Sequence, residues 1–325
     1  YPMRLVRAEL GRGSRKLDPG ALTAGRLKRM SSIRRKLKAD RTLYQIQDIS
    51  GCRAILSSID DVRAVQRIYD DGGTRHSEVI NRDDYIERPK PDGYRSQHLV
   101  VRFDGTEEQT GGNRLVVEVQ LRTRLQHAWA TAVEAVGLVR NESLKAGKGN
   151  PDWLRLFQLM SGEIAEAEGC AGPTTCPVST SERRAELREL DAKLDASKVL
   201  ESYNQALRYA EGYLSLKGNS YLIRFDLQTQ RVTVATFSQF RKASQQYLNA
   251  EMFDADLANT VLVEVDGVED LRAAYPNYFL DVTAFTRLLR KAISESYKEK
   301  GSAEASPGSK WASVIRWTFG GGAGR

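Results

Sequence analysis

The sequence predicts an α+β protein with a mixed β-sheet flanked by helices, followed by a smaller C-terminal α/β module. Strand-like runs alternate with helical patterns before residue 140, and a second set of both follows residue 220. The 325 residues leave room for about two domains. We expect a first domain at 1–150, a helical connector at 151–200, a regulatory module at 201–300 and a flexible tail at 301–325.

The first predicted element is a helix over residues 21–39. Apolar residues from Leu27 to Leu37 recur at steps of three or four and form one buried stripe. Lys28, Ser32 and Lys36 follow one another at steps of four along a different face. The helix therefore presents a polar, basic row.

The remaining elements follow from hydrophobic periodicity and from the positions of glycine and proline. Strands are predicted at 51–56, 77–86, 97–104, 114–123, 221–226, 231–236 and 261–265. Helices are predicted at 59–69, 125–139, 153–168, within 182–216, near 239–253, at 268–274 and at 282–297.

Positive charge is concentrated at the start of the chain. Residues 1–41 hold 13 Lys and Arg against 3 Asp and Glu, whereas the whole chain has a net charge of +7. This asymmetry favours partners that carry phosphates. A solvated basic helix would have the same composition.

The predicted strand at 114–123 has a polar face. Glu118, Gln120 and Arg122 alternate with apolar residues and therefore share one side of the strand. Asp48 lies at the entry to the strand at 51–56. If the two strands are neighbours, Asp48 and Glu118 can converge on one Mg²⁺, which favours one or two carboxylates together with substrate phosphates.

A rigid loop precedes the strand at 97–104. Two prolines and a glycine fix residues 87–95 as an exposed turn. Lys90, Tyr94, Arg95 and His98 lie within nine residues of one another. The aromatic ring offers a base-stacking surface, and the cationic side chains offer phosphate contacts.

These segments, in this order, resemble the RelA/SpoT-type pyrophosphokinase (alarmone synthetase) domain over about residues 20–140. The matching segments are Gly25-Arg26-Leu27-Lys28 with Ser32-Ile33 and Lys36, Asp48-Ile49-Ser50-Gly51-Cys52-Arg53, Asp84-Tyr85-Ile86 with Pro89-Lys90, Gly93-Tyr94-Arg95-Ser96-Gln97-His98, and Val117-Glu118-Val119-Gln120-Leu121-Arg122-Thr123. The resemblance implies a nucleotidyltransferase-like fold, ATP as pyrophosphate donor, Mg²⁺ as cofactor and a ribose 3′-hydroxyl as acceptor.

The resemblance also implies a role for each of these residues. Arg26 and Arg53 would hold adenine, and Lys28, Ser32 and Lys36 would hold the triphosphate. Asp48 would bind Mg²⁺, and Glu118 would share the metal or act as base. The implied acceptor contacts are Lys90, Tyr94, Arg95, His98, Gln120 and Arg122.

The acceptor stays open between two classes. The basic N-terminus favours the 3′ end of tRNA, as in the toxic small synthetases that inhibit translation. A guanine or adenine nucleotide, giving an alarmone, is the alternative. Asp92 departs from the asparagine that many relatives carry before Gly93-Tyr94, which leaves the acceptor in doubt.

The C-terminal part resembles the regulatory module of fused toxin–antitoxin synthetases of the CapRel type. Tyr275-Pro276-Asn277-Tyr278 matches a Tyr-x-x-Tyr motif that closes the ATP site, and a phage or other protein trigger would release it. The hypothesis is that Tyr275 or Tyr278 occupies the adenine position between Arg26 and Arg53. Two aromatic residues packed in an ordinary core are the alternative.

A non-catalytic RNA-binding module is the competing class of function. It explains the basic N-terminus but not two carboxylates beside phosphate-binding lysines, since carboxylates repel RNA unless a metal intervenes. Three cysteines favour the cytosol over a disulfide-rich secreted protein. Since no apolar run approaches the ~18 residues that span a bilayer, no membrane contact is expected.

Overall fold

The computed structural model describes residues 2–38, 42–111, 115–207, 219–226, 232–253, 258–265, 268–279 and 281–295. The chain divides into two compact units. The first unit comprises Tyr1–Asp83, Gln97–Thr123 and Tyr209–Phe279, and the second comprises Asp84–Ser96, Arg124–Arg208 and Leu280–Arg325. The predicted tail at 301–325 lies outside the described residues. None of the helices described has the length and apolar character needed to cross a membrane.

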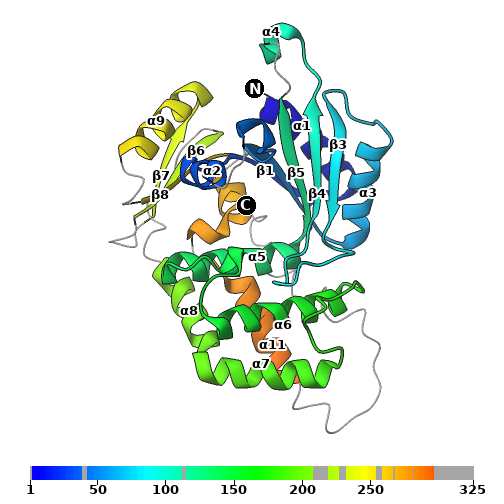
Figure 1. The fold of residues 1–325 in the computed structure, drawn as a ribbon, viewed down its shortest axis with the longest axis vertical. Coiled ribbons are helices and arrows are strands. Elements are labelled where there is room, and N and C mark those ends of the chain that lie inside the picture. Colours follow the sequence, from blue (N-terminus) through cyan, green and yellow to red (C-terminus); the bar gives the residue numbers. More distant parts are fainter. Residues whose placement is uncertain are drawn as a thin grey trace, which may run out of the picture. The chain divides into compact units, whose positions relative to one another are not determined.

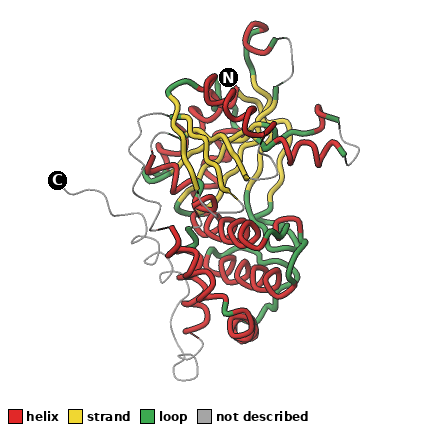
Figure 2. The backbone as a smooth tube through the Cα atoms, turned by 90° about the vertical axis from the view of Figure 1, so that its left-hand side faces the viewer, coloured by secondary structure: helices red, strands yellow, loops and turns green. Residues whose placement is uncertain are grey.

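The first unit is built on an eight-stranded mixed sheet with the order β3-β4-β5-β2-β1-β8-β6-β7 (Figure 1). Its strands are β1 (Leu22–Leu27), β2 (Ser50–Leu56), β3 (Ser77–Asp84), β4 (Gln97–Phe103), β5 (Val116–Thr123), β6 (Ser220–Asp226), β7 (Val232–Phe237) and β8 (Ala258–Glu264). β2 and β5 are parallel, and the other pairs with a described register are antiparallel. The predicted mixed sheet is confirmed, and the strands appear as one group in Figure 2.

The predicted helix at 21–39 is wrong in its first part. Residues 22–27 form β1, and the helix α2 begins only at Met30 and ends at Leu37. β1 is central in the sheet, paired with β2 on one side and β8 on the other. Helix α1 (Pro2–Leu17) packs close to it at Gly25, where a Cβ atom would lie 3.3 Å from Arg7 Cδ. Residues 22–27 form a strand in spite of the local helical periodicity, because neighbouring strands pair with both edges of β1.

One face of this sheet is covered by α1, α3 (Ile59–Asp70) and α9 (Phe240–Phe253). α3 begins where the sequence indicates, because Ser58 Oγ caps the backbone N–H of Asp61. α9 lies beside β6–β8 (Figure 1), and its Ala243 and Tyr247 form a buried cluster with Leu262. A short helix, α4 (Glu107–Thr110), lies in the connection between β4 and β5.

The C-terminal strands do not form a separate sheet. β8 pairs with β1, so β6, β7 and β8 extend the same sheet that contains β2 and β5. α10 (Val268–Ala274) contacts β1 and also belongs to the first unit. The first compact unit therefore combines segments that are far apart in the sequence, because β8 pairs with β1. The domain boundaries expected from the sequence stay predictions.

The second unit is helical. Its helices are α5 (Arg124–Arg140), α6 (Pro151–Ala167), α7 (Thr180–Leu194), α8 (Ala196–Leu207) and α11 (Thr283–Glu295). Its core contains an aromatic series in which the Phe157 ring centroid lies 5.8 Å from that of Trp153 and 5.5 Å from that of Phe285. The loop 84–96 packs on α5 and α6 through Gly93, whose carbonyl accepts a hydrogen bond from Ser161 Oγ at 2.6 Å.

Candidate active site

Two lysines converge on one carboxylate at the start of β2. Lys36 Nζ lies 3.0 Å from Asp48 Oδ1, and Lys28 Nζ pairs with Asp48 Oδ2. The backbone N–H of Lys28 also donates to the carbonyl of Ile49 at 2.8 Å, which fixes the end of β1 beside the turn that carries Asp48. Burial raises the pKa of Asp48, but hydrogen bonds and positive charge from the two lysines outweigh it and lower the pKa.

A second polar cluster lies on β5 and β4. Glu118 Oε1 accepts a hydrogen bond from His98 Nδ1 at 3.0 Å, and Oε2 accepts one from Gln120 Nε2 at 2.6 Å. Arg122 Nη2 donates to Gln120 Oε1 at 2.9 Å. Burial alone would raise the pKa of Glu118, but His98, Gln120 and the charge of Arg26 lower it to about 2. Glu118 is therefore ionised across the physiological pH range.

Arg26 links the two clusters. In the sheet register Glu118 is opposite Gly51, and Gly51 is opposite Arg26. The positive charge of Arg26 acts on Glu118 and also on Lys28. Since Arg26 and Lys28 are two residues apart, their side chains point to the same face. Lys28, which pairs with Asp48, and Arg26, whose charge acts on Glu118, thus lie on the same side of β1. Convergence of Asp48 and Glu118 on one metal ion stays a prediction.

Arg53 lies on this same face and contacts the C-terminal part of the chain. It is opposite Ala24 and therefore a diagonal neighbour of Arg26. Its guanidinium carbon lies 5.3 Å from the centroid of the Tyr275 ring, and its Nη1 donates to the carbonyl of Ala274 at 3.2 Å. Tyr275 is only 2% exposed. The side chain of Tyr278 lies outside the described part of the structure.

The residues present suit a magnesium ion that arrives with phosphates. Among the described residues, no group of three or more His, Cys, Asp or Glu side chains is placed to hold a metal ion. Two carboxylates on one polar face are the donor set that Mg²⁺ uses when substrate phosphates complete its coordination. In this structure the oxygens of Asp48 and Glu118 are partnered by Lys28, Lys36, His98 and Gln120.

Three of the predicted acceptor residues belong to the second unit. Lys90 Nζ lies 4.3 Å from the Tyr85 ring centroid and 5.3 Å from that of Tyr94. Tyr94 is 9% exposed and packs edge-on against Trp129. The Tyr94 ring is therefore held between Lys90 and α5 and is largely buried, and its stacking on an acceptor base stays a prediction.

Arg95 has a structural contact that the sequence did not indicate. Its side chain is 2% exposed, and Nη1 lies 3.0 Å from Glu168 Oε2 at the end of α6. A direct contact of Arg95 with an acceptor would require this buried ion pair to open.

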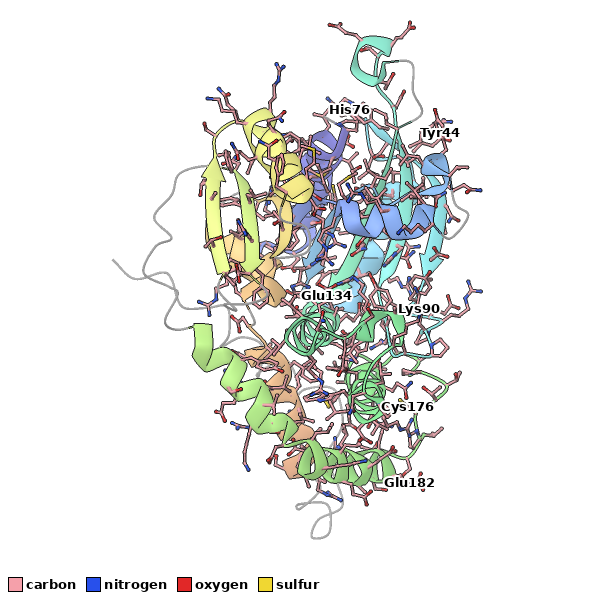
Figure 3. The ribbon with its side chains drawn as sticks, turned by 60° about the vertical axis from the view of Figure 1, so that its left-hand side comes forward. Tyr44, His76, Lys90, Glu134, Cys176 and Glu182 are labelled. Atoms are coloured by element: carbon pink, nitrogen blue, oxygen red, sulfur yellow. The ribbon has the colours of Figure 1, made fainter. Side chains whose placement is uncertain are left out.

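Sequence reasoning missed Tyr247, whose hydroxyl donates to the carbonyl of Lys28 at 3.3 Å. No local pattern reveals this contact, because α9 and β1 are distant in the sequence. Ser32 is on α2 as expected, and its N–H bonds the carbonyl of Arg29 at 3.0 Å. Tyr44 of the 3₁₀ turn Leu43–Gln45 is 88% exposed and carries its ring at the surface (Figure 3).

Lysines and carboxylates on one sheet face are typical of proteins that bind nucleotide phosphates together with a divalent metal. Residues 25–138 match the family described as "Region found in RelA / SpoT proteins". This segment is therefore similar to the RelA/SpoT region, and the resemblance stated from the motifs is confirmed over it.

Curated proteins that are similar to part of this chain are named as GTP pyrophosphokinases or as a probable GTP diphosphokinase. The chain is 29% identical over 164 residues to GTP pyrophosphokinase YjbM of Bacillus subtilis, covering 46% of this chain and 76% of that protein. It is 29% identical over 151 residues to a GTP pyrophosphokinase of Escherichia coli, covering 44% of this chain and 19% of that protein. It is 38% identical over 114 residues to a probable chloroplastic GTP diphosphokinase, RSH3, of Arabidopsis thaliana, covering 34% of this chain and 14% of that protein.

Two solved structures are also similar to part of the chain. Small alarmone synthetase 1 from Bacillus subtilis, bound to its product pppGpp, is 26% identical with a TM-score of 0.43, covering 52% of this chain and 90% of that chain. A GTP pyrophosphokinase family protein from Streptococcus pneumoniae is 26% identical with a TM-score of 0.41, covering 50% of this chain and 82% of that chain.

Proposed function

We propose that this chain is an ATP-dependent pyrophosphokinase that transfers the β,γ-pyrophosphate of ATP to a ribose 3′-hydroxyl. The observation that carries the proposal is the convergence of Lys28 and Lys36 on Asp48, on the sheet face that also holds Arg26 and Glu118. Pyrophosphoryl transfer depends on positioning and charge neutralisation more than on covalent chemistry, and these side chains supply both.

In this proposal each side chain keeps the role that the motifs imply. Arg26 and Arg53 stack on adenine, since both are planar cations on neighbouring strands of one face. Lys28, Ser32 and Lys36 bind the triphosphate, and Asp48 and Glu118 would hold Mg²⁺. When bound, Mg²⁺ would neutralise phosphate charge as a Lewis acid.

The proposed reaction forms one bond and breaks one bond at the β-phosphorus of ATP. The acceptor 3′-oxygen forms a bond to the β-phosphorus, and the bond from that phosphorus to the oxygen on the α-phosphate breaks. AMP leaves, and the hydroxyl proton goes to a base. The pKa of about 2 makes Glu118 a weak base in the free protein. Its metal-binding role is therefore favoured over the role of base.

A guanine nucleotide is the favoured acceptor, because the curated relatives named above are GTP pyrophosphokinases or a probable GTP diphosphokinase. His98, Gln120 and Arg122 would contact it from the first unit, and Lys90 and Tyr94 stay predicted contacts. The 3′ end of tRNA is the second candidate, favoured by the 13 Lys and Arg within residues 1–41. An adenine nucleotide is the remaining alternative.

The C-terminal part of the first unit is proposed to inhibit the site. Tyr275 contacts the guanidinium that would stack on adenine, so ATP and Tyr275 compete for Arg53. This contact of Tyr275 supports the expected self-inhibition, and a role of Tyr278 stays a prediction. Release by a phage or other protein trigger, and a toxin function, stay predictions.

Transfer of label tests the proposal. The purified chain is incubated with γ-labelled ATP and Mg²⁺, separately with GDP, GTP, ADP or tRNA. Label in GDP or GTP supports the favoured acceptor, and label only in tRNA replaces it with the second candidate. Absence of label in every acceptor, including with the Tyr275→Ala variant, would reject the enzyme and favour a non-catalytic RNA-binding module.

A further inference from the structure

Glu264 is a buried carboxylate that the proposed reaction does not use. It ends β8, is 1% exposed, and accepts hydrogen bonds at Oε1 from Arg4 Nε at 3.0 Å and from Ser220 Oγ at 3.3 Å. Its Oε2 is buried without a hydrogen-bond partner among the described residues. Burying a charged carboxylate with an unsatisfied oxygen costs free energy of folding, so the position of Glu264 needs a physical explanation.

Glu264 lies at a short connection within the sheet. Among the described residues, the register between β1 and β8 has two residue pairs, Gly25 with Glu264 and Arg26 with Val263. By contrast, β6 and β8 share seven pairs, and β1 and β2 share six. The three C-terminal strands therefore join the rest of the sheet through a short pairing that includes Glu264.

The positive charge that balances Glu264 comes from α1. Burial raises the pKa of Glu264, and the charges of Arg4 and Arg7 lower it only in part. Arg4 also lies over the Phe240 ring of α9, with its guanidinium carbon 5.9 Å from the ring centroid. Arg4 thus contacts both β8 and α9 from the N-terminal end of the chain, while half of its side chain is exposed.

We propose that the Arg4–Glu264 ion pair controls whether β8 stays paired with β1, and thereby whether Tyr275 covers Arg53. With Arg4 in place, the carboxylate at this junction is compensated and the pairing holds. When Arg4 is removed or drawn away, the carboxylate loses its direct ion-pair partner and is compensated only in part, by Arg7, inside a two-pair connection. When β8 separates from β1, water can reach and solvate the Glu264 carboxylate.

The consequence for the nucleotide site follows from chain connectivity. Tyr275 comes eleven residues after Glu264 in the sequence, directly after α10. A displacement of β8 therefore moves the segment that holds Tyr275 against Arg53. This inference rests on the proposed role of Arg53 in binding ATP and adds a control element that the motifs do not contain.

The test compares four full-length variants for binding of a non-hydrolysable ATP analogue. Arg4→Gln is expected to bind the analogue about tenfold more tightly than wild type, a difference of ~1.4 kcal/mol. Glu264→Gln alone should stay close to wild type, because it removes the buried charge. Arg4→Gln combined with Glu264→Gln should return to within about threefold of wild type. Arg102→Gln removes an exposed ion pair with Glu78 at the far end of the same sheet and serves as the matched control.

Hydrogen exchange of the backbone amides of residues 261–264 gives a second readout that does not need nucleotide. These amides should exchange faster in Arg4→Gln and recover in the double variant. If Arg4→Gln fails to fold, Ser220→Ala removes the other partner of Oε1 and should shift both readouts in the same direction.

The outcomes separate this inference from the proposed function. Wild-type binding and exchange in Arg4→Gln, with tighter binding in Tyr275→Ala, would overturn the control by Arg4 and keep the proposed function. No analogue binding by any variant would overturn the proposed function. Hydrogen exchange would then still decide whether the ion pair holds the β1–β8 connection.

Discussion

The guanidinium of Arg53 packs against the ring of Tyr275 and donates a hydrogen bond to the preceding residue, Ala274. The ring centroid lies 5.3 Å from the guanidinium carbon, and the carbonyl of Ala274 accepts a hydrogen bond from Nη1 at 3.2 Å. A cation held against an aromatic face in a desolvated position is stabilised by about 2 kcal/mol. An ATP molecule that uses Arg53 must displace this contact.

Removing the Tyr275 ring should favour nucleotide binding. Tyr275→Ala is expected to tighten binding of a non-hydrolysable ATP analogue by about tenfold, because the competing cation–π contact is lost. Tyr275→Phe keeps the ring and should stay close to wild type. Isothermal titration calorimetry measures both, and equal affinities in the two variants would contradict competition at Arg53.

Asp48 should matter far more for transfer than for folding. Asp48→Asn is expected to lower the transfer rate at least about a hundredfold, since metal binding contributes several kcal/mol to such reactions. Its effect on unfolding should be about 1 kcal/mol or less, because the carboxylate is partly exposed. Asp70→Asn removes an ion pair with Arg82 of similar exposure in the same unit and should leave transfer intact. A large loss of stability in Asp48→Asn would indicate a structural role instead.

Glu118 should contribute to stability above its unfolded pKa. A glutamate in an unfolded chain titrates near ~4.3, whereas the folded-state pKa of Glu118 is about 2. Because the folded pKa is depressed, the contribution is present above about pH 4.3 and is lost as pH falls toward about 2; it amounts to at most ~3 kcal/mol.

Glu118→Gln should therefore make the acid limb of the stability curve shallower. Chemical denaturation at several pH values measures the slope, with the exposed Glu107→Gln as control. An unchanged slope in Glu118→Gln would show that the hydrogen bonds from His98 and Gln120 do not stabilise the ionised form.

Gly93 should be sensitive to any side chain. Its φ is +95°, and a Cβ atom would lie 3.0 Å from Ser161 Cβ and 3.1 Å from Trp129 Cζ2. Gly93→Ala is expected to destabilise the second unit by ~3 kcal/mol through backbone strain and overlap. Gly147→Ala has a φ of +68° but open space, and should cost only the ~1–2 kcal/mol of backbone strain. Equal costs in urea denaturation would show that the loop at Gly93 relaxes.

Much of the fold and part of the site were accessible from the sequence. The alternation of polar and apolar residues predicted a polar face on β5, and in the structure Glu118, Gln120 and Arg122 lie on one side of the strand. Helix α3 was predicted from its apolar spacing, and the structure has a helix over Ile59–Asp70. Sequence patterns of this kind are enough to predict an element where its conformation follows the local preference of its residues.

The remaining features depend on contacts between residues distant in sequence. Residues 22–27 form a strand because β2 and β8 pair with both of its edges, although the apolar spacing after Leu27 indicated a helix. The contact of Tyr247 with the Lys28 carbonyl and the burial of Arg95 against Glu168 have the same origin. No local pattern distinguishes a cation that binds a ligand from one that binds another side chain.

Label transfer in the uninhibited background tests the central claim most directly. Tyr275→Ala and Tyr275→Ala/Asp48→Asn are compared with γ-labelled ATP, Mg²⁺ and GDP or GTP. The predicted result is labelled guanine nucleotide with the first variant and none with the second. Absence of transfer by a Tyr275→Ala protein that binds the ATP analogue, or equal transfer by both variants, would contradict the account.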